Sequence, residues 1–378
     1  MNHPLRALAL LLAIGCAPLA AQRQLEPSTP SGGNDWAITP ELQAAVAKAH
    51  RWLAGQQHEA GYWTQHIGFK LNTDYRITKE NAPHVGVTAL ALISFLAGGH
   101  VPGRGEFGAV TSRGLDYVLR TVQENGYVTE NGTRMYSHAF ATLFLAEVYG
   151  MTRRQDVKRA LQKAVNLIVD SQNNEGGWRY KPFARESDMS VTVCQVLALR
   201  SARNVGIAVP ASTIRAAETY VRRSAVRERG FNRNPYSWGG DLLGDGGAFR
   251  YQLTSNSRAT FPLTAAGVTT LYAAGIYDDE LVRRALDYLD SQMAIFNESY
   301  RHHYFFYYGH YYAVQAYYIT GGNRWNVYFR NMRDHQLLPF QRADGSWPND
   351  VGPGDAFATA IATLILQIPY QYLPIFQR

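Results

Sequence analysis

The chain alternates between two kinds of helical hydrophobic pattern from residue 39 onward. The first kind carries apolar residues on one side and charged residues on the other, which is typical of a helix with one face in water. Six segments show it: 40–56, 109–123, 154–172, 210–223, 279–292 and 323–340. The second kind is short, rich in Ala and Gly, and almost uncharged. Six segments show this pattern: 85–97, 138–150, 190–202, 264–275, 310–320 and 355–366.

Helices that are apolar nearly all round must be surrounded by protein. Because the six apolar segments alternate strictly with the six amphipathic ones, we predict an all-α fold, an (α/α)6 toroid with six inner and six outer helices. Neither half could close such a ring alone, so residues 39–378 are expected to form one domain. Pro40 and Pro210 at the starts of outer segments, and the glycine pairs at 98–99 and 321–322 after inner ones, agree with these helix ends.

A loop motif of the form Q-x3-G-x-W recurs at 57–63, 172–178 and 341–347, with weaker echoes at 123–127 and after Gln292. Each copy follows an amphipathic segment and precedes an apolar one. Repetition of a motif at long intervals indicates a repeat architecture.

These loops resemble the QW repeats of the prenyltransferase and squalene-oxidase-repeat superfamily, which includes triterpene cyclases and protein prenyltransferase β subunits. The segment 176–182, followed by Asp188, is similar to the stretch that leads into the zinc site of those β subunits. The resemblance covers about residues 39–369, and the chain is also similar to exported bacterial repeat proteins. It implies an (α/α)6 toroid with a ligand cavity along its axis.

The chain departs from that family at two places that carry its chemistry. Class II cyclases take a strong acid from an Asp-x-Asp-Asp cluster, which this sequence lacks. The zinc site would need a cysteine two residues after Asp188, where Ser190 stands, with Cys194 one turn later. We therefore predict no cofactor, and zinc held by Asp188 and His310 is the metal alternative.

The first residues resemble an export signal. Residues 1–21 carry a positive charge at Arg6, then an apolar run too short to span a bilayer, and then small residues suited to cleavage. Residues 22–38, rich in Pro and Gly, are predicted to be a flexible leader. The sequence before Cys16 is close to a lipoprotein cleavage box, so the exported protein is expected in the periplasm or cell envelope, either free or tethered through a lipid on Cys16.

The net charge and the cysteine content limit which kinds of partner and ligand are expected. The formal net charge of +7 favours acidic ligands, but the basic residues are scattered, so we predict no nucleic-acid partner. Once the signal is removed by secretion, Cys194 is the one remaining cysteine, and its apolar surroundings indicate a buried, inert thiol. We expect a monomer.

In this topology all inner helices run parallel, so their first residues should meet at one opening of the ring. The residues at these positions are His84, His138, Asp188, Ser190, Thr264, His310 and Asp355. Clustered helix N-termini favour anions and neutral imidazoles, which can act beside carboxylates as general acids and bases. We predict Asp188, His138, His310 and Asp355 as catalytic residues; the alternative is that the polar residues only cap their helices.

Aromatic residues are concentrated at 301–312, where the fifth inner helix begins. Buried tyrosines need hydroxyl partners, which favours a polar, aromatic cavity over an oily one, although a large aromatic core would give the same composition. The residues predicted to bind the ligand are His84, Trp178, Arg179, Tyr180, Trp238, Tyr308, Tyr311 and Tyr317.

Three functions fit these patterns. The first, which we favour, is the binding of a hydrophobic or isoprenoid ligand in the central cavity, with or without its chemical conversion. The second is a lyase or hydrolase for acidic polysaccharides, because α/α toroids host such enzymes and Arg134, Arg179 and Arg250 could neutralise sugar carboxylates. The third is a non-catalytic binding or scaffold protein of the envelope.

Overall fold

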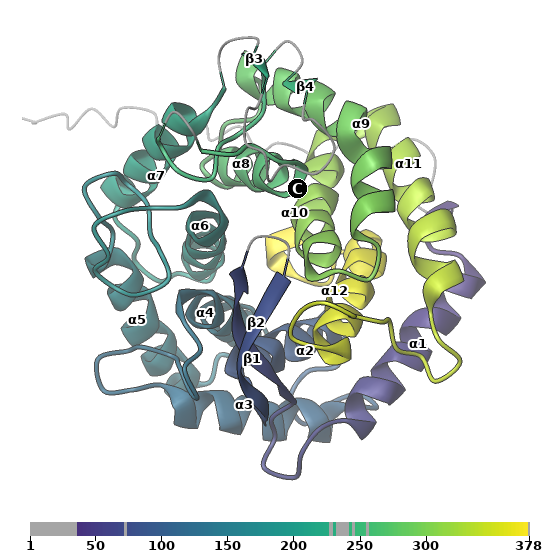
Figure 1. The fold of residues 1–378 in the computed structure, drawn as a ribbon. Coiled ribbons are helices and arrows are strands. Elements are labelled where there is room, and N and C mark those ends of the chain that lie inside the picture. Colours follow the sequence, from purple (N-terminus) through teal and green to yellow (C-terminus); the bar gives the residue numbers. More distant parts are fainter. Residues whose placement is uncertain are drawn as a thin grey trace, which may run out of the picture. The chain divides into compact units, whose positions relative to one another are not determined.

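The computed structural model describes residues 36–71, 74–226, 230–231, 242–243, 246–254 and 257–376. Within them, outer and inner α-helices alternate along the chain and form two concentric rings (Figure 1). The outer helices are α1 (Pro40–Gly55), α3 (Gly108–Thr121), α5 (Gln155–Asp170), α7 (Ala211–Ser224), α9 (Glu280–Tyr300) and α11 (Gly322–Asn331). The inner helices are α2 (Val85–Ala97), α4 (Met135–Thr152), α6 (Met189–Asn204), α8 (Phe261–Ala273), α10 (Tyr304–Thr320) and α12 (Asp355–Gln367).

Each inner helix packs against the next, and α12 packs against α2, so the inner ring is closed. Every residue of α2 is buried, whereas α5 buries only an apolar stripe that includes Val157, Leu161 and Ile168. This contrast is what the two hydrophobic patterns predict. The (α/α)6 toroid is confirmed.

The Q-x3-G-x-W loops connect neighbouring outer helices through hydrogen bonds. In the second copy, the Trp178 indole Nε1 donates to the Ile168 carbonyl of α5 at 2.7 Å. The Gln172 amide donates to the carbonyl of Gly176 at 2.8 Å and to that of Thr213, in α7, at 2.9 Å. The loop therefore ties the end of one outer helix to the beginning of the next.

The other two copies repeat this geometry. Gln57 donates to the Val110 carbonyl of α3 at 2.9 Å, and Gln341 donates to the Ala45 carbonyl of α1 at 2.8 Å. Trp63 and Trp347 donate their indole N–H groups to carbonyls of the helical segments that precede them. Because the last loop binds the first helix, the same contact that spaces the outer helices also closes the outer ring.

The glycine of each loop touches the backbone of the neighbouring outer helix. Gly176 has φ of +94°, and a Cβ added there would collide with the Ala216 carbonyl oxygen of α7. Equivalent contacts occur at Gly61, Gly126, Gly247 and Gly345. Only glycine combines this backbone conformation with so close an approach.

A β-hairpin that the helical pattern did not predict lies between the first loop and α2. Strands β1 (Thr64–Leu71) and β2 (Asp74–Pro83) pair antiparallel and reach across the ring opening (Figure 1). The His66 N–H donates to the Pro353 carbonyl at 2.8 Å, which fixes the hairpin to the segment before α12. A shorter antiparallel pair joins β3 (Gly230–Phe231) to β4 (Leu242–Leu243).

The described residues, from 36 to 376, belong to one compact unit. The predicted signal peptide, residues 1–21, with Cys16, and most of the leader lie outside the described residues. The end of the leader, residues 36–38, does not match the predicted flexible segment: Ala37 is fully buried, and its carbonyl accepts from the Arg333 guanidinium at 3.1 Å. None of the helices in the described part of the chain is long and apolar enough to cross a bilayer.

The loop contact can be tested by replacing Gly176 with alanine. We expect Gly176→Ala to lower the free energy of unfolding by at least about 3 kcal/mol, because backbone strain and a collision with Ala216 act together. Gly206→Ala is the matched control, since Gly206 has φ of +91° but no heavy atom within 4 Å of an added Cβ. It should cost about 1 kcal/mol. Equal losses in denaturant titrations would show that the contact with α7 is unimportant.

Candidate functional site

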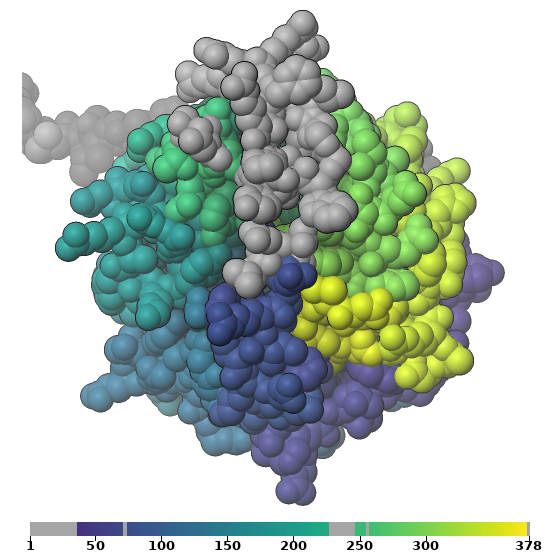
Figure 2. Space-filling model, viewed as in Figure 1, coloured from purple at the N-terminus to yellow at the C-terminus, as the bar shows by residue number. Residues whose placement is uncertain are grey.

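A cavity of about 260 Å³ lies at the opening where the inner helices begin. All six inner helices contribute to its wall, so the predicted gathering of their N-terminal ends is confirmed. The wall residues that belong to the inner helices, or directly precede one, include His84, Leu90, Tyr136, Phe140, Ser190, Phe261, Tyr304, Phe305, Tyr308 and Phe357. The hairpin adds Ile67, Phe69, Lys70 and Tyr75, and Figure 2 shows the hairpin, in dark blue, on this face of the molecule.

Three basic side chains line this cavity: Lys70, Arg134 and Arg258. The Lys70 Nζ lies 4.5 Å from the centroid of the Phe305 ring, and the Arg258 guanidinium lies 5.0 Å from that of Tyr251. The Arg134 guanidinium lies over the Phe69 ring. Among the described residues, none of the three forms a salt bridge, and no Asp or Glu belongs to the cavity wall. The cavity is therefore aromatic and positively charged.

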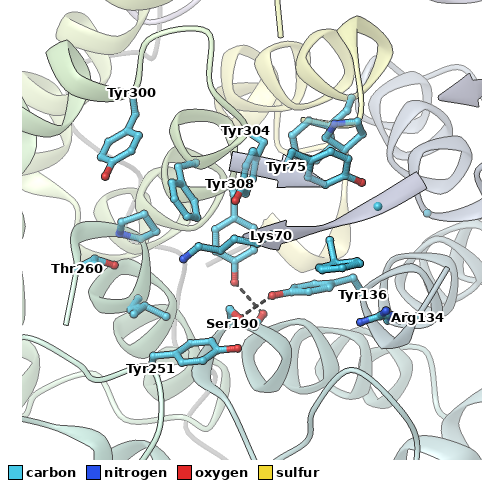
Figure 3. A pocket seen from close by; sticks show the side chains of 18 of the residues that line it. Lys70, Tyr75, Arg134, Tyr136, Ser190, Tyr251, Thr260, Tyr300, Tyr304 and Tyr308 are labelled. Atoms are coloured by element: carbon cyan, nitrogen blue, oxygen red, sulfur yellow. Dashed lines mark hydrogen bonds between the residues drawn. The ribbon is translucent and has the colours of Figure 1, made fainter. Parts of the chain in front are cut away.

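The ammonium group of Lys70 is destabilised by its position. Burial is the main cause, and the charge of Arg258 adds to it; together they lower the pKa of Lys70 to about 6, against a smaller opposing effect of Asp188. Figure 3 shows Lys70 among the labelled tyrosines of the cavity.

Asp188 lies directly behind the wall, fully buried at the N-terminus of α6. Its Oδ1 accepts from the Val191 N–H at 2.9 Å and from the Ser190 hydroxyl at 2.7 Å. Ser190 in turn accepts from the Tyr136 hydroxyl at 2.6 Å (Figure 3). Tyr251 donates to the Asp188 Oδ2 at 3.4 Å. Burial raises the pKa of Asp188 to about 6, although these hydrogen bonds favour its ionised form.

The expectation that His138, His310 and Asp355 face the opening with Asp188 is wrong. His138 accepts from the Val128 N–H at 3.1 Å, and Asp355 accepts from the Asn349 N–H at 2.8 Å and pairs with Arg342. His138 and Asp355 bind the loop that precedes their own helix, because both stand in the first turn of an inner helix, on the side that faces that loop.

His310 points between helices instead of into the ring. Its Nδ1 lies 2.9 Å from the Tyr328 hydroxyl of α11, and its Nε2 lies 2.6 Å from the Asn297 Oδ1 of α9. Burial lowers the pKa of His310 to about 3 and that of His138 to about 4, so both imidazoles are neutral at physiological pH. Thr264 resembles His138 in binding the preceding loop, since it accepts from the Phe249 N–H at 3.1 Å.

Some of the predicted ligand-binding residues line the cavity, and others do not. His84, Tyr180 and Tyr308 line the cavity. Trp178 belongs to the loop contact with α5, and Arg179 pairs with Glu186 outside the cavity wall.

Two further tyrosines of this set do not line the cavity. Tyr311 packs on Phe140 and Tyr312 without lining the cavity. Tyr317 is not turned inward, because it stacks on Tyr328 and donates to Asp290 of α9 at 2.6 Å. Trp238 lies outside the described residues.

Five cavity residues were not predicted from the sequence: Lys70, Tyr75, Tyr136, Tyr251 and Arg258. Lys70 and Tyr75 belong to the hairpin, and Tyr251 and Arg258 belong to the segment before α8, so no helical periodicity marks them. Tyr136 lies just before the apolar pattern of its helix. At that position only its aromatic side chain could have indicated a place in the cavity wall.

The side chains suggested for zinc do not converge. Asp188 and His310 are engaged by different neighbours, Ser190 holds the position of the expected cysteine, and the Cys194 thiol lies 2.9 Å from the Tyr312 hydroxyl. In the described part of the chain, no group of three or more His, Cys, Asp or Glu side chains is arranged to hold a metal ion. These residues do not fit a zinc site.

No family model and no curated protein matches this sequence. Solved structures do match the fold. The α-1,6-mannanase GH76A of Salegentibacter sp. HEL1_6, in an inactive variant with α-1,6-mannotriose, aligns with a TM-score of 0.57 and 9% identity, covering 88% of this chain and 98% of that one. The apo type II terpene cyclase MstE of Scytonema aligns with a TM-score of 0.54 and 14% identity, covering 89% and 98%. The protein shares the α/α toroid fold of both enzymes.

The buried Asp188 predicts a specific pH dependence of stability. Its folded-state pKa is raised from 3.8 to about 6, so the folded protein binds this proton more tightly than the unfolded chain. The free energy of unfolding should therefore fall by roughly 3 kcal/mol from this group as pH rises from about 4 to 6.

Asp188→Asn keeps the helix cap but cannot ionise. As pH rises from about 4 to 6, the wild type should lose roughly 3 kcal/mol of unfolding free energy relative to the variant, which lacks this titration. A constant difference in denaturant titrations would contradict the raised pKa.

Proposed function

We propose that the central cavity binds an amphipathic anion, with the acid group between Lys70 and Arg258 and an apolar, isoprenoid-type body against the aromatic wall. The observation that carries this proposal is the presence of three basic side chains, and no carboxylate, in the described wall of an aromatic cavity. Charges removed from water are costly unless an opposite charge accompanies them. A bound anion would supply that charge.

The apolar part of the wall supports the second half of the proposal. Phe140, Phe261, Phe305 and Phe357 surround the cavity with ring faces and edges. Such surfaces pack against branched hydrocarbon chains and contribute about 25 cal/mol per Å² of apolar area removed from water. MstE has been solved with geranylgeranyl dihydroxybenzoate, a molecule that joins an isoprenoid chain to an aromatic acid. A ligand of this kind would satisfy both halves of the cavity.

An acidic-polysaccharide lyase is the second candidate. It is favoured by Tyr251, which lies in the cavity wall, donates to Asp188 and carries Arg258 over its ring. A phenol backed by a carboxylate can transfer a proton while a guanidinium neutralises the sugar acid. Glycoside hydrolysis is supported less well, because it uses a pair of carboxyl groups beside the scissile bond, and the described wall contains none. Binding of uronic-acid oligosaccharides with release of ultraviolet-absorbing products would favour the lyase.

A non-catalytic envelope protein stays compatible with the binding proposal, since neither requires turnover. We also infer export and, as an alternative to free secretion, a lipid tether on Cys16. The mass of the mature N-terminus distinguishes these two, because lipid attachment adds acyl chains to the cysteine.

The anion proposal predicts that Arg258→Gln weakens binding of a geranylgeranyl-substituted hydroxybenzoate at least about tenfold, equivalent to about 1.4 kcal/mol. The methyl ester of the same compound, which lacks the charge, should bind the wild type about as weakly as the acid binds the variant. Arg330→Gln is the matched control, because the Arg330 guanidinium lies 5.1 Å from the Trp36 ring centroid and outside the cavity wall. Titration calorimetry that found acid and ester equally tight would overturn the proposal.

The affinity should also depend on pH through Lys70. With a pKa of about 6, the amine in the empty cavity is mostly neutral above that pH and must take up a proton to pair with the anion. Affinity should therefore rise as pH falls from 8 to 6, by up to about tenfold per unit. Lys70→Met should flatten this profile, whereas a profile identical to that of the wild type would rule out Lys70 as the linked group.

A further inference from the structure

We propose that Lys70 is a nucleophilic amine that forms an imine with an aldehyde or ketone held in the central cavity. The inference rests on the proposed function for the apolar part of the ligand and adds a reactive carbonyl to it. Lys70 stands on β1 and faces a cavity whose wall is built by the inner helices (Figure 3).

The first observation is the environment of the amine. Its Nζ rests against the Phe305 ring at 4.5 Å, makes no hydrogen bond or salt bridge with any described residue, and feels the repulsion of the nearby Arg258. An amine that is desolvated and close to another cation loses its proton easily, which is how proteins activate lysine towards carbonyl groups. Its lowered pKa, about 6, agrees with this position.

The second observation is an unsatisfied phenol in the same wall. The hydroxyl of Tyr304 is buried and has no hydrogen-bond partner in the described part of the chain. Its ring packs 4.5 Å from that of Phe305, the ring on which Lys70 rests. Buried polar groups are nearly always paired, so an unpaired phenol in the same cavity wall as the amine indicates a polar ligand atom at this place. A carbonyl oxygen would accept its hydrogen bond.

The chemistry balances without an oxidant or a metal. The lone pair of the Lys70 nitrogen adds to the carbonyl carbon, and a proton passes from nitrogen to oxygen, which gives a carbinolamine. Loss of the hydroxyl group with a proton then releases one water and leaves a carbon–nitrogen double bond. In this scheme the Tyr304 phenol, which belongs to the same cavity wall, polarises the carbonyl oxygen and assists its departure.

The test uses citral, an isoprenoid aldehyde, with cyanoborohydride at pH 7 to reduce any imine to a stable amine. Peptide mass spectrometry should find the adduct on Lys70 at least about tenfold faster than on any exposed lysine of the same sample, because an ordinary lysine amine, with a pKa near 10.4, is almost fully protonated. Equal labelling of Lys70 and exposed lysines would overturn the proposal. Acetaldehyde, a smaller probe, should show the same preference, so poor entry of citral cannot account for a failure.

Two arginine variants of the same hairpin provide the controls. Lys70→Arg keeps the positive charge but removes the nucleophile, and should abolish the fast labelling. Lys79→Arg, at an exposed position on β2, should leave it unchanged. Melting temperatures close to that of the wild type would show that both variants fold. Tyr304→Phe should slow trapping at Lys70 while the binding affinity for a carboxylate without a carbonyl group is retained, a split that a merely structural role would not give.

The outcome is separable from that of the proposed function. If the isoprenoid acid binds but Lys70 is not labelled preferentially, the imine proposal fails and the anion proposal stands. If Lys70 is labelled and the acid neither binds nor slows the labelling, the imine site stands and the anion proposal fails. If the acid slows the labelling, both ligands occupy the same cavity.

Discussion

The close contact between each Q-x3-G-x-W loop and the next outer helix is the constraint on which this fold depends. At Gly176 the loop backbone meets the Ala216 carbonyl with no space for a side chain, while Gln172 and Trp178 bind carbonyls on the two helices that the loop joins. A repeated contact of fixed size gives a repeated spacing between helices. Since the last copy binds α1, the spacing yields a closed ring.

Closure of the ring decides where chemistry can occur. The inner helices begin together, but some polar residues of their first turns bind the preceding loops, as His138 does with Val128 and Asp355 with Asn349. These side chains thereby accept hydrogen bonds from loop N–H groups. Several chemically reactive groups at the opening come from elsewhere: Lys70 from the hairpin, and Arg258 with Tyr251 from the segment before α8. Tyr304 is an exception, because it begins the inner helix α10.

The electrostatics of the cavity follow from which residues face it and which bind the loops instead. Helix N-termini carry partial positive charge, and Arg134 and Arg258, with Lys70 when it is protonated, have the same sign. Asp188, which could compensate, lies behind the wall and is held by Ser190 and Val191. The basic side chains and the aromatic surface together support the proposal of an amphipathic anion as ligand. Burial, with the charge of Arg258, lowers the pKa of Lys70. The same environment makes that lysine a candidate nucleophile.

The sequence by itself determined the helices, their alternation and the ring, because helical periodicity and a repeated loop motif are local patterns that need no knowledge of the fold. It also placed His84, Tyr180 and Tyr308 near the opening. Only the tertiary structure decided the direction of His310, which turns towards Tyr328 and Asn297, and the entry of Lys70 into the cavity. A helix position fixes where a residue stands, whereas the neighbours packed around it decide which hydrogen bonds and charges its side chain meets.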